Sequence, residues 1–355
     1  MASGFAELSE VFLSEVLSRK QKQSVRVRAV HVDDYLGRAD LRKVKVEHPE
    51  GSAHLIVKVL PQNRRREALV WRFLDQAGAM PLPKVYHVEF DQRLGSYGVI
   101  TEFLAPLGET EAWEAPQVQR VGRALAALHA AFWARTDGLP EPFAAPETPA
   151  EAAVEPAARR FVDGLSPGRQ ERLYADVPDA LMLLVKLLRM PPSFFAEATD
   201  IPSTLIHGRL RRSEVLFRPH GAGPQPVFID WYEARIGRGT EDLASLANSV
   251  PAGERPAATE GLLAGYLEGL KAAEVVFDLE RIREELDRQR VLLGCGHLPG
   301  RCTQYIERYR DPEQRASCPA LAGEIVADAA EWRRLLKQQS RKARHAPVEE
   351  PEDIT

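Results

Sequence analysis

One segment of the chain, Leu205–Phe217, brings together residue types that could do chemistry, in the order LIHGRLRRSEVLF. It carries a His-Gly pair at His207, an arginine at Arg209 and a carboxylate at Glu214, and a second carboxylate, Asp230, ends a later apolar run. Oxygen ligands suit hard cations such as Mg²⁺, so the carboxylate of Glu214 could bind magnesium. Arg209 could serve neither as a metal ligand nor as a general base, because an arginine pKa lies above about 12.

The N-terminal part of the chain has the pattern of a small antiparallel sheet. After an amphipathic helix at the N-terminus, SVRVRAVHVDD and LRKVKVEH alternate with the period of two expected of half-buried strands. Three further strands are predicted at HLIVKVL, KVYHVEFDQ and SYGVITEFL. Between the third and fourth strands, the segment from Asn63 to Gly78 has helical spacing, and Gly78 supplies its stop. The predicted order is strand, strand, strand, helix, strand, strand.

From Pro116 onward the sequence predicts mostly helices. The segment QVQRVGRALAALHAAFWAR puts apolar residues along one helical face, so we expect this helix to be buried. Two short strands, STLIHG and PVFIDW, precede a helical stretch from about Glu241 to Leu336 that is interrupted near LPGRC. The polar tail from Gln338 has the composition of a disordered segment. The sequence therefore divides into a sheet lobe over 1–105, a helical lobe over 106–337 and a tail over 338–355.

The composition argues against several classes of protein. Lys and Arg number 47 against 51 Asp and Glu, a net charge of −4 without a basic stripe, so nucleic-acid binding has no electrostatic support. No apolar run approaches the roughly 18 residues that span a bilayer, and the N-terminus lacks a signal-peptide core, so we expect a cytoplasmic protein without membrane contact. The three cysteines are odd in number and form no CxxC pair, which favours buried thiols over disulfides or a zinc site.

With the later segments FIDW (228–231) and EDLA (241–244), the segment Leu205–Phe217 resembles the aminoglycoside/choline kinase-like phosphotransferase family. The signature of that family is His-Gly-Asp-x-x-x-x-Asn, followed by an Ile-Asp-Trp or similar metal-binding segment and by an Asp-Leu-Ala that opens a helix. The resemblance covers nearly the whole folded chain, because the N-terminal pattern also fits. It implies an α+β, bilobal protein-kinase-like fold, with ATP and Mg²⁺ as cofactors and a small molecule as substrate or ligand.

The resemblance also implies roles for residues of the sheet lobe. Lys58 in the third strand would reach the α- and β-phosphates, and Glu67 on the following helix would orient it through an ion pair. The backbone around Glu102 and Leu104 would hydrogen-bond the adenine. Gly37, between the first two strands, is the one glycine of the turn that would cover the phosphates.

In the helical lobe, the resemblance makes Asp230 the metal ligand that bridges Mg²⁺ to the nucleotide phosphates. Asp242 would brace the catalytic loop from the start of a helix. His207 would hold the geometry of that loop by hydrogen bonding and would not transfer protons. His129, on the helix that follows Pro116, is expected to be a core histidine with its hydrogen bonds satisfied.

Two positions depart from the family signature. Arg209 stands where the family has its catalytic aspartate, and Glu214 stands where it has an asparagine that binds the second metal ion. In one interpretation, Arg209 fills an abandoned metal site by pairing with Glu214 or Asp230. In another, the arginines of the loop clamp an anion (Arg209, Arg211 and Arg212).

The sequence therefore predicts a pseudokinase, which keeps weak nucleotide or ligand binding without phosphotransfer and could regulate a protein partner. One alternative is an active phosphotransferase for a small hydroxylated or amino-sugar-like substrate, with its base relocated to Glu214 or Glu233. The other alternative is nucleotidyl transfer on the same scaffold, which would keep the lysine and the three remaining carboxylates (Lys58, Glu67, Glu214 and Asp230).

Overall fold

The computed structural model describes residues 8–34, 40–78, 81–92, 94–105, 113–140, 143–144, 150–196, 200–221 and 223–345. The chain forms two compact units, one made of Met1–Ala144, Ser203–Asp242 and Gly261–Val275 and the other of Ala145–Pro202, Leu243–Glu260 and Val276–Thr355. These units do not follow the expected division at residue 105, because the chain returns to the first unit at Ser203 and again at Gly261. The first unit thus contains the sheet and all of the predicted site residues.

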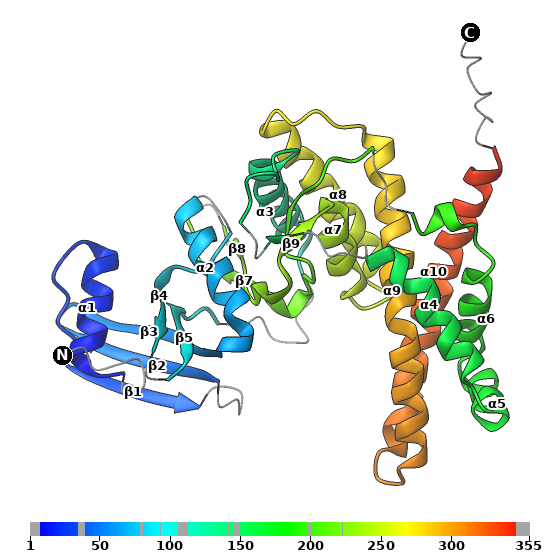
Figure 1. Cartoon of the computed structure of the whole chain (residues 1–355), viewed down its shortest axis with the longest axis horizontal. Helices are drawn as coiled ribbons and strands as arrows, with labels where there is room; N and C mark the ends of the chain where they lie inside the picture. Colours follow the sequence, from blue (N-terminus) through cyan, green and yellow to red (C-terminus); the bar gives the residue numbers. More distant parts are fainter. Residues whose placement is uncertain are drawn as a thin grey trace. The chain divides into compact units, whose positions relative to one another are not determined.

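Five antiparallel strands form the sheet of the first unit, in the order β1-β2-β3-β5-β4 (Figure 1). They are β1 (Ala29–Asp34), β2 (Leu41–His48), β3 (Gly51–Pro61), β4 (Val85–Asp91) and β5 (Ser96–Glu102). Helix α2 (Arg65–Ala77) follows β3 after a 3-10 turn, η1 (Gln62–Arg64). The predicted order of strands and helix is confirmed, and burial in β3 alternates along its middle as its sequence pattern indicates.

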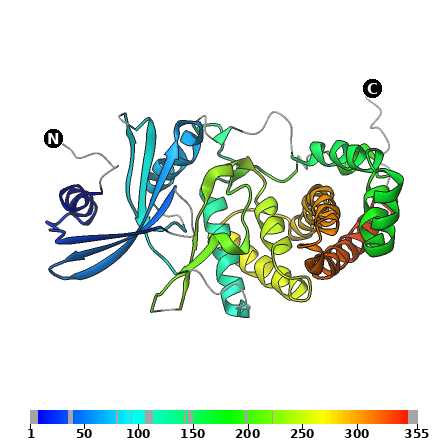
Figure 2. The ribbon, with the colours of Figure 1, turned by 90° about the horizontal axis from the view of Figure 1, so that it is seen from below.

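Helices α1 (Glu10–Gln21) and α2 lie on opposite sides of this sheet (Figure 2). The side chain of Ser9 caps α1 by accepting from the N–H of Phe12 at 3.3 Å, and the apolar face of α1 packs in one core cluster with Val57 of β3. Successive side chains of a strand point to opposite faces, so Lys58 faces the other way, toward α2. Helix α2 ends at Gly78, whose φ of 80° is the left-handed conformation typical of a helix stop.

The rest of the first unit contains helices and two short antiparallel pairs, β6 with β9 and β7 with β8. The predicted buried face of the helix after Pro116 is confirmed at Val118, Val121, Leu125 and Leu128, whereas Phe132, on the same face, is only half-buried. The elements are α3 (Ala115–Phe132), β6 (Thr204–Ile206), η4 (Arg212–Glu214), β7 (Val215–Arg218), β8 (Gln225–Phe228), η5 (Trp231–Glu233) and β9 (Arg235–Gly237). Helices α7 (Gly239–Asn248) and α8 (Arg255–Ala272) belong to it in part.

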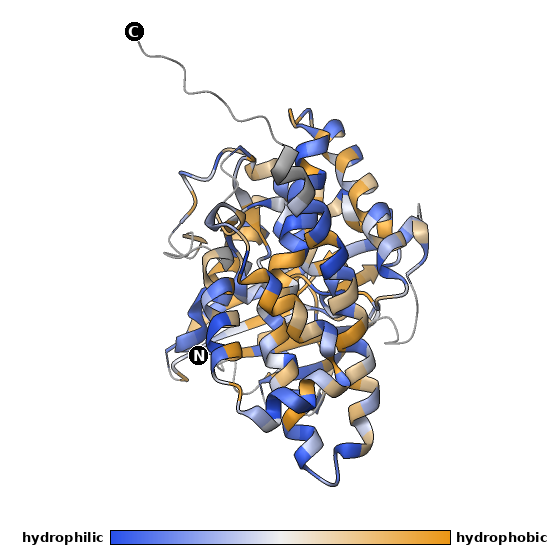
Figure 3. Cartoon of the chain, turned by 90° about the vertical axis from the view of Figure 1, so that its right-hand side faces the viewer, coloured by the Kyte–Doolittle hydropathy of each residue, from blue (hydrophilic) through white to orange (hydrophobic). Residues whose placement is uncertain are grey.

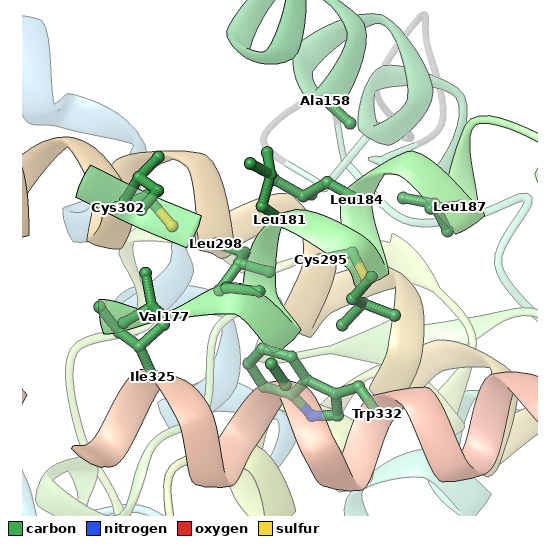
Figure 4. Packing of buried hydrophobic residues seen from close by; sticks show 14 of the residues in the cluster. Ala158, Val177, Leu181, Leu184, Leu187, Cys295, Leu298, Cys302, Ile325 and Trp332 are labelled. Carbon is green, nitrogen blue, oxygen red and sulfur yellow. The ribbon is translucent and has the colours of Figure 1, made fainter. Parts of the chain in front are cut away.

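The second unit is helical, and its core is a single cluster of apolar side chains. Leu181 and Leu184, Cys295 and Leu298, and Trp332 come together there from three helices (Figure 4). Hydrophobic and hydrophilic residues are interleaved along these helices, as expected where one face is buried (Figure 3). The elements are α4 (Ala150–Asp163), α5 (Pro167–Asp176), α6 (Pro178–Leu187), η3 (Pro192–Phe194), α9 (Leu279–Arg310), η6 (Arg315–Ser317) and α10 (Cys318–His345).

Two expectations for this unit are wrong. Helix α9 runs without interruption through LPGRC, with Pro299 inside it, because Leu298 and Cys302 on either side are both held in the core. Helix α10 continues to His345, so the predicted disorder from Gln338 does not hold for the first eight residues of that segment, whose sequence is rich in good helix formers. The remaining tail, 346–355, lies outside the described residues.

The cysteines behave as predicted. Cys295, Cys302 and Cys318 are buried and unpaired with one another. Burial raises the pKa of the Cys302 thiol to about 12, so it stays protonated at neutral pH. In the described part of the chain, no helix is both long enough and apolar enough to cross a membrane.

Candidate functional site

The loop after β6 is held by one buried carboxylate, Asp242, in the first turn of α7. Its Oδ2 accepts from the backbone N–H of His207 at 2.7 Å and its Oδ1 from that of Gly208 at 2.9 Å. The Nε2 of His129 lies 3.2 Å from Oδ2, and its Nδ1 lies 3.0 Å from the hydroxyl of Tyr266. Burial alone would raise the pKa of Asp242, but the bonds to His129 and His207 hold it below its ordinary value. Asp242 therefore braces the loop as predicted, and His129 is a satisfied core histidine.

Gly208 is required in this loop for two reasons. Its φ is 87°, in the left-handed region where a side chain is strained. A Cβ at this position would also lie 2.2 Å from the carbonyl oxygen of Glu233. The His-Gly pair of the sequence therefore reflects a close approach between the loop and η5.

His207 ties the loop to the strand that precedes Asp230. Its Nε2 lies 2.8 Å from the carbonyl oxygen of Ile229, so Nε2 carries the proton, and its ring lies 4.7 Å from the ring of Trp231. Its Nδ1 is buried without a hydrogen-bond partner among the described residues. Burial lowers the pKa of His207, which favours a neutral ring that positions the backbone.

This histidine should make the protein less stable in mild acid. Because its folded-state pKa is below the ordinary 6.5, the unfolded chain binds a proton there that the folded chain excludes, so stability falls as the pH drops below about 6.5. The carboxyl of Glu214, whose pKa is raised, acts in the opposite direction, so the comparison needs a variant. The variant His207→Gln keeps an N–H near Ile229 but has no imidazole to titrate. Its melting temperature should therefore fall less than that of the wild type when the pH is lowered from about 7.5 to 5.5. Equal losses would contradict this assignment.

Lys58 lies at the centre of the site. Its Nζ forms an ion pair with Oε1 of Glu67 on α2, and it lies 3.3 Å from Oδ1 of Asp230. Glu67 is 0% exposed, and its Oε2 accepts from Arg64 at 2.7 Å. The predicted pair of Lys58 with Glu67 is therefore formed. Lys58 also contacts Asp230, which is 172 residues away in the sequence.

Asp230 has an unusual backbone. Its φ of 63° and ψ of 54° are left-handed, a conformation that aspartate adopts more readily than most residues with a side chain. Burial would raise the pKa of its carboxyl, but the ammonium of Lys58 holds that pKa below its ordinary value. Asp230 is thus ionised and already has a counter-charge in the absence of a ligand.

Glu214 is a different kind of carboxyl. It is buried at the end of η4, and its Oε2 accepts from the backbone N–H of Arg211 at 2.8 Å. Burial, with a further contribution from the charge of Asp230, raises the pKa of Glu214 to about 7. Near neutral pH it is therefore divided between its protonated and ionised forms.

Arg209 does not pair as expected. Its Nη1 lies 2.9 Å from Oε1 of Glu233, and both side chains are about two-fifths exposed, at 43% and 42%. The expectation that Arg209 pairs with Glu214 or Asp230 is wrong, since Lys58 already compensates Asp230 and Glu214 is bound to the backbone of its own turn. Glu233 is placed next to the loop by the close approach at Gly208, which the sequence did not indicate as a contact.

At the end of β5, Glu102 is engaged through its side chain. Its Oε1 accepts from the N–H of Lys84 at 2.7 Å and from Nε of Arg218 at 3.1 Å, a partner that no local pattern predicted. The backbone N–H groups of Glu102 and Phe103 donate to the carbonyls of Lys84 and His54. Of the predicted adenine-binding backbone, only the N–H of Leu104 has no acceptor among the described residues. Gly37 lies outside the described residues.

Whether these residues suit a magnesium ion can be tested on their chemistry. Asp230 keeps one carboxylate oxygen without a hydrogen bond to any described residue, and so does Glu214. Among the described residues, no group of three or more His, Cys, Asp or Glu side chains could hold a metal by itself. Mg²⁺ is commonly held by one or two carboxylates together with substrate phosphates and water. The pair fits an ion that arrives with a nucleotide, and does not fit a resident metal.

Solved structures with the same fold carry small-molecule kinase activities. A spectinomycin phosphotransferase, solved with ADP and spectinomycin, is 13% identical with a TM-score of 0.52, over 91% of this chain and 98% of that one. An aminoglycoside phosphotransferase from Alicyclobacillus acidocaldarius is 15% identical with a TM-score of 0.55, over 90% and 93%. An ethanolamine kinase from Plasmodium vivax is 14% identical with a TM-score of 0.52, over 86% and 83%. At such identities the likeness shows the fold alone.

The sequence itself gives the family. No curated protein sequence matches the chain at a significant level. The sequence profile described as the phosphotransferase enzyme family matches residues 35–284, which include strands β2 to β5 of the sheet, the loop at His207 and the segments of Asp230 and Asp242. The fold is the kinase-like α+β architecture that the resemblance implied. The chain is therefore a member of the phosphotransferase enzyme family.

Proposed function

We propose that this member of the family is a pseudokinase, which binds a nucleotide but transfers its phosphate poorly or not at all. One observation carries the proposal. Lys58, Glu67 and Asp230 are assembled as a nucleotide site requires, whereas the place of the catalytic base holds Arg209 in an ion pair with Glu233. The three residues proposed to bind the nucleotide are in contact, and a cation stands where the group that would activate an acceptor is expected.

The binding half of the site uses residues that are already in position. Lys58 would contact the α- and β-phosphates, with Glu67 fixing its direction. The N–H of Leu104 would donate to the edge of the base. Asp230 and Glu214 would hold Mg²⁺, which when bound would neutralise charge on the phosphates. Relatives of the same fold have been solved with ADP, and with AMP-PNP and Ca²⁺, which supports a nucleotide as the ligand.

In the proposed pseudokinase, the position of the general base is taken by Arg209. A positioned general base contributes about 10²–10⁴ to the rate of such a reaction. A guanidinium only donates hydrogen bonds, so Arg209 cannot take the proton of an acceptor hydroxyl. Its pairing with Glu233 also occupies the carboxylate nearest to it.

A second candidate is an active phosphotransferase that uses Glu233 as its base. The observation that favours it is that Glu233 reaches residue 209 and is 42% exposed, so an acceptor could approach it. The relatives' names, spectinomycin phosphotransferase, amicoumacin kinase and ethanolamine kinase, make a small hydroxylated molecule the acceptor to test. Phosphorylation of such a molecule that is lost in Glu233→Gln would favour this candidate.

Calorimetric titration with ATP and magnesium tests the proposed binding. We expect a dissociation constant of roughly tens to hundreds of micromolar, about 5–6 kcal/mol, because the lysine and both carboxylates are present. Lys58→Met should abolish the binding, whereas Lys45→Met, on strand β2, should not. If the wild type gives neither heat nor a thermal shift with millimolar ATP, with and without magnesium, the site is a relic and the proposal is wrong.

A further inference from the structure

Arg64, the last residue of η1, makes contacts in three directions. Its Nη2 lies 2.7 Å from Oε2 of Glu67, and its Nη1 lies 3.4 Å from Oδ2 of Asp40, the residue before β2. Its guanidinium carbon also lies 5.3 Å from the centre of the ring of Tyr232, two residues after Asp230. One side chain therefore contacts the start of β2, helix α2 and the segment that carries the candidate metal ligand.

The contact with Glu67 is the strongest of the three. Glu67 is 0% exposed and divides its two oxygens between two cations, Oε1 to Lys58 and Oε2 to Arg64. A buried carboxylate with only one partner would leave an oxygen unsatisfied and its side chain free to turn about its terminal bond. Arg64 fixes the plane of the carboxylate from the side opposite to Lys58.

The position of Lys58 depends on that plane. Its ammonium lies between Glu67 and Asp230, at 3.3 Å from the latter. If Glu67 turned away, the attraction of Asp230 would be the remaining constraint, and Lys58 would move onto the carboxylate that a metal ion needs. By ordering Glu67, Arg64 thus keeps Lys58 available for phosphates and prevents Lys58 from pairing fully with Asp230.

We propose that Arg64 is a positioning residue of the nucleotide site, which orders Glu67 and thereby presents Lys58 to the phosphates of a bound nucleotide. The proposal rests on the proposed function for its nucleotide, but the arrangement of Lys58 can be tested without one. The variant Arg64→Lys should keep only part of this positioning role. An ammonium lacks the planar guanidinium that contacts Glu67 and Asp40 together.

The test compares neighbouring arginines. Arg65 is exposed and has no described ion pair, so Arg65→Ala is a matched control for Arg64→Ala. We expect Arg64→Ala to weaken ATP·Mg²⁺ binding about tenfold, Arg64→Lys to recover part of the loss, and Arg65→Ala to stay within about twofold of the wild type. Titrations would be followed by the shift in melting temperature. Equal effects of Arg64→Ala and Arg65→Ala would overturn the proposal.

A double-substitution cycle separates positioning from a direct contact with the phosphates. If Arg64 acts through Glu67, Arg64→Ala should add less than about a twofold loss when Glu67→Gln is already present. A full tenfold loss in that background would mean that Arg64 acts independently of Glu67, which contradicts the positioning role.

A measurement on the protein alone decides the case if the wild type binds no nucleotide. Acylation of Lys58 by an N-hydroxysuccinimide ester, followed by mass spectrometry, reports how firmly its amine is held. Arg64→Ala should raise the rate of this labelling about fivefold and Arg65→Ala should leave it unchanged, since only the first releases the partner of Lys58. Unchanged labelling in Arg64→Ala overturns the proposal, whereas a failure of ATP to bind would overturn only the proposed function.

Discussion

The pair of substitutions Arg209→Asp and Glu214→Asn should give the protein a measurable ATPase activity, at least about 100 times its own background. The first places a carboxylate where the family has its catalytic aspartate, and the second restores an amide as the second metal ligand. The rest of the site needs no rebuilding, because Lys58, Glu67 and Asp230 are in place and Asp242 already holds the loop. Release of phosphate from ATP in the presence of magnesium measures the effect.

The matched control is Arg209→Asn with Glu214→Asn, which removes the same cation but supplies no base. If both double variants hydrolyse ATP at the same rate, activity does not depend on a carboxylate at 209 and the pseudokinase argument loses its main support. The free energy of unfolding of Arg209→Ala should lie within about 1 kcal/mol of that of the wild type. Both side chains of the Arg209–Glu233 pair are exposed, and exposed ion pairs contribute little to stability. A larger loss would show that Arg209 has a structural role that its contacts do not reveal.

Asp242→Asn should produce the largest loss of stability in the first unit, about 3 kcal/mol. The carboxylate accepts from the N–H of His207 and of Gly208 while it faces His129, and an amide has one acceptor oxygen where the carboxylate has two. One buried N–H would therefore meet an NH₂ group. Urea unfolding, monitored by tryptophan fluorescence, measures the change in the free energy of unfolding.

The same chemical change at an exposed aspartate provides the reference. Asp75 forms an exposed ion pair with Lys20, so Asp75→Asn should cost less than about 1 kcal/mol. If Asp242→Asn lowered the free energy of unfolding no more than Asp75→Asn, the hydrogen bonds from the loop to Asp242 would contribute little to stability. The bracing role of Asp242 would then be wrong. ATP binding should weaken together with stability, because Asp242 holds His207 and Gly208 at the start of the loop that leads to Glu214, the proposed metal ligand.

Several features were determined by the sequence alone. The strands of the sheet follow from residues that alternate with a period of two, and the order of strands and helix was confirmed. The stop of α2 follows from Gly78, which adopts the left-handed conformation without strain. The pair of Lys58 with Glu67 was also predicted, from the resemblance of the sequence to the phosphotransferase family, and it is formed.

Tertiary structure decided which charges meet. The loop carboxylates and arginines are all within the first unit, and the sequence allowed Arg209 to pair with either Glu214 or Asp230. The backbone approach at Gly208 brings Glu233 to Arg209, while Lys58 reaches Asp230 across 172 residues of sequence. Such pairings depend on competition among several charges within contact distance, so no local spacing fixes them. Arg64 was the exception with a local signal, since it stands three residues before Glu67 on adjoining helical turns.

The helices of the second unit show the same division. Pro299 and the glycines near it carry local preferences against a helix, yet α9 continues because Leu298 and Cys302 are anchored in a core assembled from α6, α9 and α10. The sequence determined which faces of these helices are apolar and hence that they pack. That α9 continues past Pro299 was decided by the tertiary contacts, because the free energy of burying its apolar face offsets the cost of about 3 kcal/mol of a proline inside a helix.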